Sequence, residues 1–266
     1  MTAGWPSARS GRHGRREPTP SGSPLRRGRS EPLLILGIET ATISVGCALG
    51  GHEGVLASFQ ASKGRRHVET LIPAVEFMCR HAQVELSEVG VVAVDVGPGL
   101  FSGLRVGVSA AKALAQALRI PTIGISSLDL LAFPVRYTNR LIVPAIDARR
   151  GELFYAFYRQ VPGGAQRLSP YLVGTPEDLA SELLARGEDC LVVGDGAMRY
   201  PEILTDVSGA EAGDATSAFP SAASLVELAH AQALREEFVP PWELQPLYLR
   251  KSDAEINWTA AMNRAT

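Results

Sequence analysis

Apolar and polar positions in the first part of the chain predict three consecutive β-strands. Residues 33–39 (LLILGIE) form a short apolar run that fits a buried strand. Residues 40–49 are rich in Thr, Ile, Val, Cys and Leu, and the Gly50-Gly51 pair that follows is typical of a hairpin. Residues 53–61 fit a third strand. The folded part of the chain is therefore expected to begin at Leu33 with three strands in a row.

The spacing of apolar residues becomes helical at residues 67–83. Five apolar residues share one face of this predicted helix: Val68, Leu71, Ile72, Val75 and Cys79. Three more form a second apolar stripe: Ala74, Phe77 and Met78. A helix that packs only on its own sheet needs one stripe, so the second stripe indicates contact with another helix or another subunit. Pro73 is expected to kink this helix or to end its first turn.

A helix of unusual composition is predicted at residues 101–119, after a continuous apolar strand at 91–96. Its interior holds several small residues: Gly103, Gly107, Ala110, Ala111, Ala113, Ala115 and Ala117. A glycine inside a helix costs about 0.5–1 kcal/mol relative to alanine. Gly103 and Gly107 therefore call for a reason, either tight helix packing or the close approach of another backbone. Pro121 ends the helix, and residues 122–125 fit a further strand.

The second half of the chain repeats this order of elements. Strands are predicted at 141–147, 152–158, 168–173 and 191–193. A helix follows the third of them, with Thr175 as its N-cap, proline in its first position and acids in its first turn. Residues 221–237 form a last amphipathic helix. The order strand-strand-strand-helix-strand-helix occurs twice, which predicts two α/β halves related by duplication.

The composition narrows the class of protein. The chain has 266 residues, of which 45% are hydrophobic and 20% charged, values that exclude disorder throughout. Its three cysteines are far apart in sequence, with no Cys-x-x-Cys pair, which excludes a disulfide scaffold and argues against a structural zinc site. No charge-free apolar run reaches about 18 residues, so no membrane span is expected. These features predict a reduced, cytoplasmic protein.

Charge is distributed unevenly along the chain. Residues 1–30 contain seven arginines and one acid, while the remaining 236 residues carry a net charge of about −8. Residues 1–32 are rich in Ser, Gly and Pro and are expected to be disordered. This tail fits a transit peptide, a basic arm for nucleic acid or a non-functional extension, of which the last is favoured. The acidic body is a poor RNA-binding surface by itself, so any phosphate contacts are expected to come mostly from partners.

The candidate chemistry is sparse. No paired histidines, nucleophile motif or phosphate-binding lysine occurs. A glycine-rich turn before the 101–119 helix offers free backbone amides to an anion, although a tight turn explains the same glycines. Acids that follow predicted strands either face a nucleotide cleft or cap turns. The candidate anion or nucleotide loop comprises Glu39, Thr40, Gly97, Gly99, Ser102, Gly103 and Asp147, with Asp195 as a further acid. Binding of ATP stays open.

Motifs in the same order along residues 33–250 identify a family. They are GIETATISVGCAL (37–49), RRHVETLIP (65–73), VGPGLFSGLRVG (96–107), AKALAQALRIPTIGISSLDLLA (111–132), AIDARRGELFYAFY (145–158), VVGDGA (192–197) and PLYLR (246–250). The chain resembles the TsaB (YeaZ) family, non-catalytic paralogues of TsaD. This resemblance implies the two-lobed actin/sugar-kinase/Hsp70 (ASKHA) fold, an α/β fold with a duplicated βββαβα order. It also implies a part in attaching threonylcarbamoyl to the adenosine next to the anticodon of tRNA.

The resemblance implies a division of labour between subunits. TsaD carries out the transfer with a metal bound by two histidines, and at the corresponding positions this chain has Ser127 and Leu131. Neither a hydroxyl nor an alkyl chain replaces an imidazole as a ligand. The chain is therefore expected not to be an enzyme by itself, to require no cofactor, and to bind and stabilise TsaD with TsaE as a further partner.

In the family, the two helices with unusual composition pair with the same helices of TsaD or, in its absence, of a second TsaB. The expected interface comprises Val68, Leu71, Ala74, Val75, Phe77, Met78, Gly103, Gly107, Ala110, Ala111 and Leu114. The alternative is that both apolar stripes belong to the internal core. If these residues form the interface, Ala74→Glu or Ala111→Glu is expected to abolish partner binding and to leave the monomer folded.

Four segments are expected along the chain. They are a disordered tail (1–32), a first lobe (33–138) on which the 221–237 helix packs back, a second lobe (139–220) and a C-terminal extension (238–266). Two other functions stay open, an ASKHA-fold phosphotransferase and a metallopeptidase-like protein. Three features depart from the family pattern. They are Glu39 in place of the usual Asp, Ser102 in place of the frequent Thr, and the arginine-rich tail.

Overall fold

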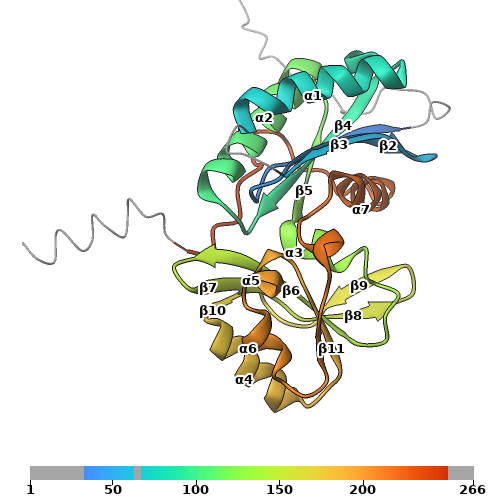
Figure 1. Cartoon of the computed structure of the whole chain (residues 1–266). Coiled ribbons are helices and arrows are strands. Elements are labelled where there is room, and N and C mark those ends of the chain that lie inside the picture. The colour runs from blue at the N-terminus through green and yellow to red at the C-terminus, as the bar shows by residue number, and fades with distance from the viewer. Residues whose placement is uncertain (1–32, 63–66, 251–266) are drawn as a thin grey trace, which may run out of the picture.

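The computed structural model describes residues 33–62 and 67–250, so the predicted tail at 1–32 lies outside it. Two β-sheets form two lobes, one above the other (Figure 1). The first sheet has the order β3-β2-β1-β4-β5. β1 pairs antiparallel with β2 and parallel with β4, which in turn is parallel to β5. Its strands are β1 (Leu34–Glu39), β2 (Val45–Gly51), β3 (Gly54–Ala61), β4 (Val89–Gly97) and β5 (Thr122–Ser126).

The second sheet repeats this order as β10-β7-β6-β11-β12. Again the central strand pairs antiparallel with the next strand in sequence and parallel with the strand on its other side. The strands are β6 (Leu141–Arg149), β7 (Glu152–Tyr155), β10 (Leu172–Gly174), β11 (Cys190–Val193) and β12 (Ala210–Ala212). The predicted duplication is therefore confirmed, and the arrangement is the two-lobed ASKHA fold.

Two strand predictions in the second lobe are wrong. The strand expected at 152–158 ends at Tyr155, and the chain restarts as β8 (Tyr158–Val161), which pairs with β9 (Gly164–Arg167) beside the main sheet order. The strand expected at 168–173 is replaced by β9 and β10. The residues at the break, Ala156 and Phe157, are fully buried in different core clusters. Because the residues at the break are as apolar and buried as those of the strands, the sequence pattern does not reveal where β7 ends and β8 begins.

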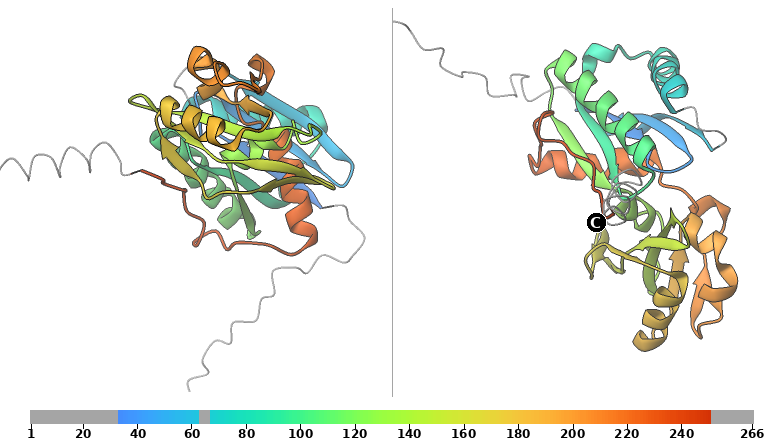
Figure 2. Two further views of the ribbon diagram at one scale, coloured as in Figure 1. Left: turned by 90° about the horizontal axis from the view of Figure 1, so that it is seen from below. Right: turned by 90° about the vertical axis from the view of Figure 1, so that its left-hand side faces the viewer.

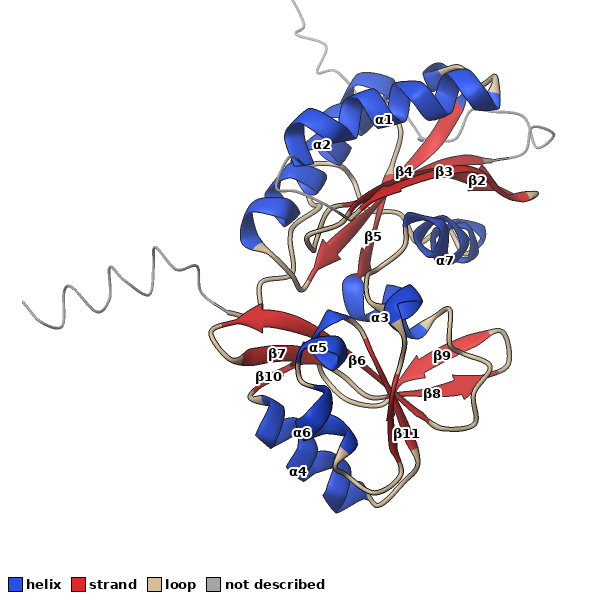
Figure 3. Cartoon of the chain, viewed as in Figure 1, coloured by secondary structure: helices blue, strands red, loops and turns tan. Residues whose placement is uncertain are grey.

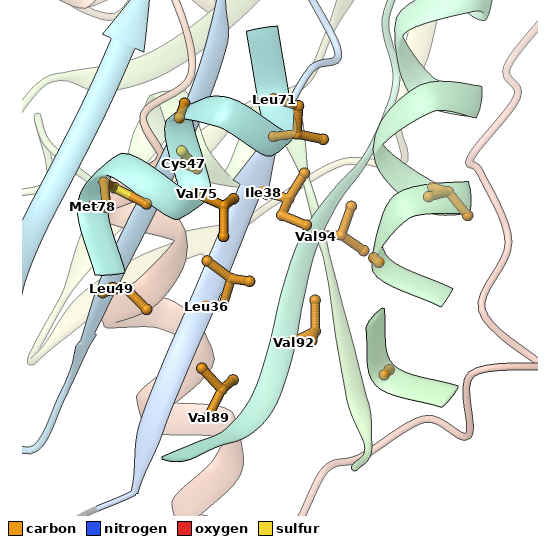
Figure 4. Close-up of a cluster of buried hydrophobic side chains, with 14 of the residues drawn as sticks. Leu36, Ile38, Cys47, Leu49, Leu71, Val75, Met78, Val89, Val92 and Val94 are labelled. Atoms are coloured by element: carbon orange, nitrogen blue, oxygen red, sulfur yellow. The ribbon is translucent and has the colours of Figure 1, made fainter. Parts of the chain in front are cut away.

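Two long helices cover one face of the first sheet and a third covers the other (Figures 1 and 3). They are α1 (His67–Ala82), α2 (Phe101–Leu118) and α7 (Ala222–Leu234). Helix α1 packs mainly on β2 and β3. Its side chains Leu71, Val75 and Met78 belong to the core cluster drawn in Figure 4. Full burial of each such side chain contributes roughly 1.5–3 kcal/mol. α7 packs against β1, β2 and β3 on the opposite face.

The helix α1 continues through Pro73, so the expectation that this proline ends the first turn is wrong. Pro73 lies on the exposed side of the helix, where water can replace the donor that proline lacks. The helices of the second lobe are shorter: α4 (Pro176–Arg186), α5 (Asp195–Arg199) and α6 (Pro201–Thr205). Thr175 caps α4 as predicted, because its hydroxyl accepts from Asp178 N at 3.1 Å and its amide donates to the Asp178 carboxylate at 2.9 Å.

Two segments connect the lobes. The short helix α3 (Ser127–Ala132) follows β5 and packs against both β4 and β6. Residues 238–250 run along the edge of the first sheet toward the second lobe (Figure 2). Val239 pairs with Thr122 of β5, Leu247 N donates to Val96 O at 2.7 Å, and Arg250 forms an ion pair with Glu152 of β7. This part of the predicted C-terminal extension therefore belongs to the fold. Single helical turns occur at Leu86–Glu88 and Ala215–Ser217.

Candidate functional site: the outer helix pair and the strand ends beneath it

The turn between β1 and β2 holds the first turns of both outer helices. The Thr40 hydroxyl donates to the carbonyl oxygen of Gly103 in α2 at 2.8 Å. His67, the first described residue of α1, places its ring nitrogen Nε2 2.9 Å from the carbonyl oxygen of Thr42, so this nitrogen carries the proton. All of these side chains are buried. The turn thereby fixes where both helices begin relative to the sheet.

Gly103 and Gly107 are explained by the close approach of this same turn. A Cβ atom at Gly103 would overlap the Thr40 carbonyl oxygen, and one at Gly107 would overlap the Thr40 hydroxyl. Gly99 is likewise backed by the Ala41 carbonyl, which accepts a hydrogen bond from Leu100 N at 2.6 Å. Gly99 and Gly103 thus accommodate the close approach of another backbone, the second of the two reasons anticipated from the sequence, and Gly107 accommodates the Thr40 side chain.

The residues predicted to form an anion or nucleotide loop are only partly brought together. Thr40, Gly99 and Gly103 are in mutual proximity around the buried β1–β2 turn. Gly97 has a positive φ of 103°, the backbone conformation expected of a tight turn, and Ser102 is exposed. Asp147 belongs to the second lobe and bonds to residues of that lobe. The binding of a nucleotide here stays a prediction.

Two buried carboxyl groups lie side by side at the ends of β1 and β4. Ile38 pairs with Val94 in the parallel register, so the next residues, Glu39 and Asp95, are neighbours about 4.8 Å apart along the sheet. Both are fully buried, and each has one oxygen without a hydrogen-bond partner among the described residues. Burial, followed by the charge of Asp95, raises the pKa of Glu39 well above its usual range.

Asp95 is held by two donors. Its Oδ1 accepts from Ser127 Oγ at 2.6 Å and from Gly97 N at 2.8 Å. Burial raises the pKa of Asp95 to about 7, against the lowering effect of these two hydrogen bonds. The sequence analysis did not single out Asp95. The sequence does hold a signal for Asp95. It stands at the end of a continuous apolar strand, and the parallel strand beside it also ends in an acid.

In the second lobe, the acid Asp147 forms ion pairs with two arginines. Asp147 lies near the end of β6, and its Oδ2 accepts from Arg149 at 2.8 Å and from Arg199 at 3.0 Å. Asp195 accepts a hydrogen bond from Asp147 N at 2.9 Å. Burial raises the pKa of Asp195, and this hydrogen bond partly offsets the effect. In the described ranges 33–62 and 67–250, no three His, Cys, Asp or Glu side chains gather as a metal-binding group.

Ser127 and Leu131, where the resemblance places the metal-binding histidines of TsaD, serve the interior of this chain. Ser127 is fully buried and donates to Asp95. Leu131 is buried in the core cluster under α3. Both side chains are therefore committed to packing and internal hydrogen bonding.

The outer face of α1 and α2 carries several exposed apolar side chains. Val68 is 70% exposed, Phe77 53% and Ile72 44%. Between the two helices lies a groove of about 330 Å³. It is lined by Val68, Leu71, Ile72, Arg105, Val106, Ser109 and Ala110. We call this surface the helix-pair face. Ile72, Val106 and Ser109 belong to it although the sequence analysis did not place them there.

The eleven residues expected at the interface divide into two groups. Seven are buried in the monomer: Leu71, Ala74, Val75, Met78, Gly103, Gly107 and Ala111. Four reach the surface fully or in part: Val68, Phe77, Ala110 and Leu114. The expectation that Ala74→Glu or Ala111→Glu would leave the monomer folded is wrong, because each would bury a carboxylate in the core. The buried side of α1 therefore takes residues from both of the apolar stripes predicted from the sequence.

Comparison with known proteins places the chain among its relatives. The family model described as TsaD, tRNA N6-adenosine threonylcarbamoyltransferase, matches residues 54–258. The tRNA threonylcarbamoyladenosine biosynthesis protein TsaB of Bacillus subtilis is 29% identical over 228 residues, 85% of this chain and 98% of that protein. Its Escherichia coli counterpart is 28% identical over 225 residues, 84% and 96% of the two chains. YeaZ of Pseudomonas aeruginosa, a solved structure, superimposes with a TM-score of 0.70 at 27% identity, over 82% of this chain and all of that chain.

The duplicated sheets and the helix pair on one lobe define the class of the molecule as a two-lobed ASKHA protein. Within that class, the chain belongs to the TsaD family. Its similarity to TsaB proteins over nearly their whole length confirms the resemblance seen in the motifs. Within the described residues, no helix is both long and apolar enough to cross a membrane.

Proposed function

We propose that this chain is a subunit required for formation of threonylcarbamoyladenosine in tRNA and that it acts by binding and stabilising a TsaD-type partner. The observation that carries the proposal is the helix-pair face. Val68 and Ile72 expose apolar side chains beside one another at the groove between α1 and α2. Clustered exposed apolar side chains of this kind mark interaction sites on proteins. The relatives named for this pathway support the choice of reaction.

The groove between α1 and α2 suits a helical partner. Ridges of side chains on one helix pack into the groove of another at 8–10 Å between axes. Small side chains at Ser109 and Ala110 line one wall of the groove and let a partner helix come close. Two helices of the partner packed on α1 and α2 would bury the exposed apolar side chains in a four-helix interface.

The same face would also join two copies of this chain. Because the groove is apolar and self-complementary packing of helix pairs is common, a homodimer is expected when the partner is absent. Addition of a TsaD-type protein should then replace the second copy. A TsaE-type ATPase and tRNA would join the complex through the partner, since the body of this chain is acidic.

Catalysis is assigned to the partner. Ser127 and Leu131 stand where the resemblance places the metal-binding histidines, and both are used inside the fold. Asp147 is neutralised by two arginines, which disfavours a phosphotransferase that needs this carboxylate for a metal. The chain therefore contributes binding energy and position to the reaction, and the transfer itself takes place on the other subunit.

A reconstitution tests this function. The chain is mixed with TsaD, TsaE, an enzyme that forms threonylcarbamoyl-AMP, ATP, threonine, bicarbonate and tRNA, and modified adenosine is measured by mass spectrometry. We expect modification that depends on the chain, and none from the chain with tRNA and threonylcarbamoyl-AMP alone. Equal modification with and without the chain would show that the proposed function is wrong.

A further inference from the structure

A pocket between the two lobes, open to solvent on one side, is not used by the proposed function. It has a volume of about 260 Å³ and lies where α3 and α7 of the first lobe meet the β8–β9 hairpin of the second. Ile125, Phe133 and Leu228 form an apolar wall. Asp129, Arg167 and Gln232 supply the polar groups. Pockets at the junction of two lobes, apolar with a few convergent polar groups, are the usual form of small-molecule sites.

The carboxylate in this pocket is fixed in place by two phenols. Tyr158 donates to Asp129 Oδ1 at 2.6 Å, and Tyr171 donates to Oδ2 at 3.1 Å. Burial raises the pKa of Tyr171 to about 12 and that of Tyr158 further, so both phenols keep their protons. Each carboxylate oxygen accepts one of these hydrogen bonds and retains acceptor capacity for a second donor. Asp129 is therefore an oriented anion that can still accept from a ligand.

A cation is fixed on another wall of the same pocket. The guanidinium of Arg167 stacks on the ring of Tyr171, 3.8 Å from its centroid. No acid of the described segments forms an ion pair with it, and Asp129 lies beyond ion-pair distance. A stacked guanidinium has a preset orientation and is suited to bidentate contact with a carboxylate. The pocket thus presents one oriented anion and one oriented cation.

We propose that this pocket binds a small α-amino acid. The ammonium group of the ligand would donate to Asp129, its carboxylate would accept from Arg167, and its side chain would lie against the apolar wall. A volume of about 260 Å³ is below the usual range for drug-sized ligands, which fits a metabolite of a few heavy atoms and excludes a nucleotide. A bound amino acid would bridge α3 and the β8–β9 hairpin and hold the lobes together.

Isothermal titration of the full chain with L-alanine, L-serine and L-threonine tests the proposal without any partner protein, so its result is separate from that of the reconstitution. We expect at least one of the three to bind. L-Alaninamide lacks the carboxylate and N-acetyl-L-alanine lacks the ammonium group, and both should bind at least tenfold more weakly than the best of the three. The absence of binding by all three at millimolar concentration would overturn the proposal, as would equal binding of either analogue.

Three variants connect binding to the pocket. Asp129→Asn and Arg167→Gln should each weaken binding at least tenfold. Arg159→Gln, an arginine in the same hairpin whose partner is Glu188 outside the pocket, should bind like the parent chain. Arg167 is exposed, so its replacement tests the site even if Asp129→Asn fails to fold. Unchanged affinity in the Arg167→Gln chain would show that binding, if any, takes place elsewhere and that the proposal is wrong.

Discussion

The two lobes share one strand order but differ in what covers their sheets. In the first lobe, two helices of 16 and 18 residues lie on the outer face and expose apolar side chains between them. In the second lobe, an 11-residue helix and two of five residues take their place. The two lobes thus have equivalent sheets, and the length and surface of the covering helices determine which lobe is suited to bind a partner.

The lobes also differ in how they treat the acids at their strand ends. Glu39 and Asp95 of the first lobe are buried together with no arginine bonded to either. Asp147 of the second lobe is buried but bonded to Arg149 and Arg199. The first pair therefore has no cation beside it to offset burial, whereas Asp147 has two. Equivalent positions in one fold thus differ in whether a cation lies beside the buried carboxyl group.

The largest expected effect is on partner binding by the first lobe. Ile72→Glu places a charge in the helix-pair face and should weaken binding to the TsaD-type partner at least about 100-fold, or about 3 kcal/mol. Ile72 is 44% exposed, so the monomer should keep its melting temperature. Leu184→Glu is the matched control, because Leu184 is 67% exposed on α4 of the second lobe. Both are measured by titration calorimetry and thermal melts.

Either of two outcomes would contradict the prediction that the first lobe, and not the second, binds the partner. Unchanged binding by the Ile72→Glu chain would show that the helix-pair face is not the interface. Equal losses with Ile72→Glu and Leu184→Glu would show that both lobes meet the partner.

A smaller effect is expected from the contact that positions α2. Gly103→Ala should lower the free energy of unfolding by about 1–3 kcal/mol, because its Cβ would overlap the Thr40 carbonyl oxygen and force the helix away from the turn. Ser109→Ala, on the exposed side of the same helix, should change stability by less than about 0.5 kcal/mol. Urea unfolding of the two variants measures the difference. A neutral Gly103→Ala would mean that the β1–β2 turn does not set the position of α2.

These comparisons also show what a single sequence can predict. The duplicated strand order follows from alternation and apolar runs, which depend only on local pattern. The partners of Gly103 could not be found in this way, since Thr40 lies 63 residues away. The sequence could show only that a glycine inside this helix is unfavourable and must be required by a close contact.

The helix-pair face was predictable in location but not in composition. Two apolar stripes on α1 signalled an additional contact, yet Leu71 and Ala74 face the core while Ile72 and Phe77 face outward. Apolar residues surround most of this helix, so hydrophobicity alone does not say which of them the sheet covers. The rotation of a helix on its sheet is set by packing, which here includes the anchoring of His67 to Thr42.

An intermediate effect should appear in the pH dependence of stability. The folded-state pKa of Asp95 is raised from about 4 to about 7, so the folded state binds the proton more tightly than the unfolded state. The contribution of Asp95 to the free energy of unfolding should therefore be greatest below about pH 4. It should fall as the pH rises toward 7 and level off above pH 7. Asp95→Asn should remove this loss, which at about 1.4 kcal/mol per pKa unit is on the order of 3 kcal/mol between pH 5 and 8.

Ser127→Ala sharpens the assignment to Asp95. Its hydroxyl donates to the Asp95 carboxylate and lowers the pKa of that group, so its removal should move the decline in stability to higher pH. Urea unfolding at several pH values measures both variants. A pH profile that is the same in Asp95→Asn as in the parent chain would assign the proton to another group.

The smallest single effect is expected at the compensated acid of the second lobe. Arg199→Gln should barely change the melting temperature, because Arg199 is exposed and Arg149 still neutralises Asp147. Arg149→Gln alone should behave in the same way. The double variant leaves the buried Asp147 carboxylate without a cation, so its loss should exceed the sum of the two single losses and approach about 3 kcal/mol or more. Simple additivity in thermal and urea unfolding would show that the arginines act independently of Asp147, and the contrast with the uncompensated Glu39 and Asp95 would then lose its basis.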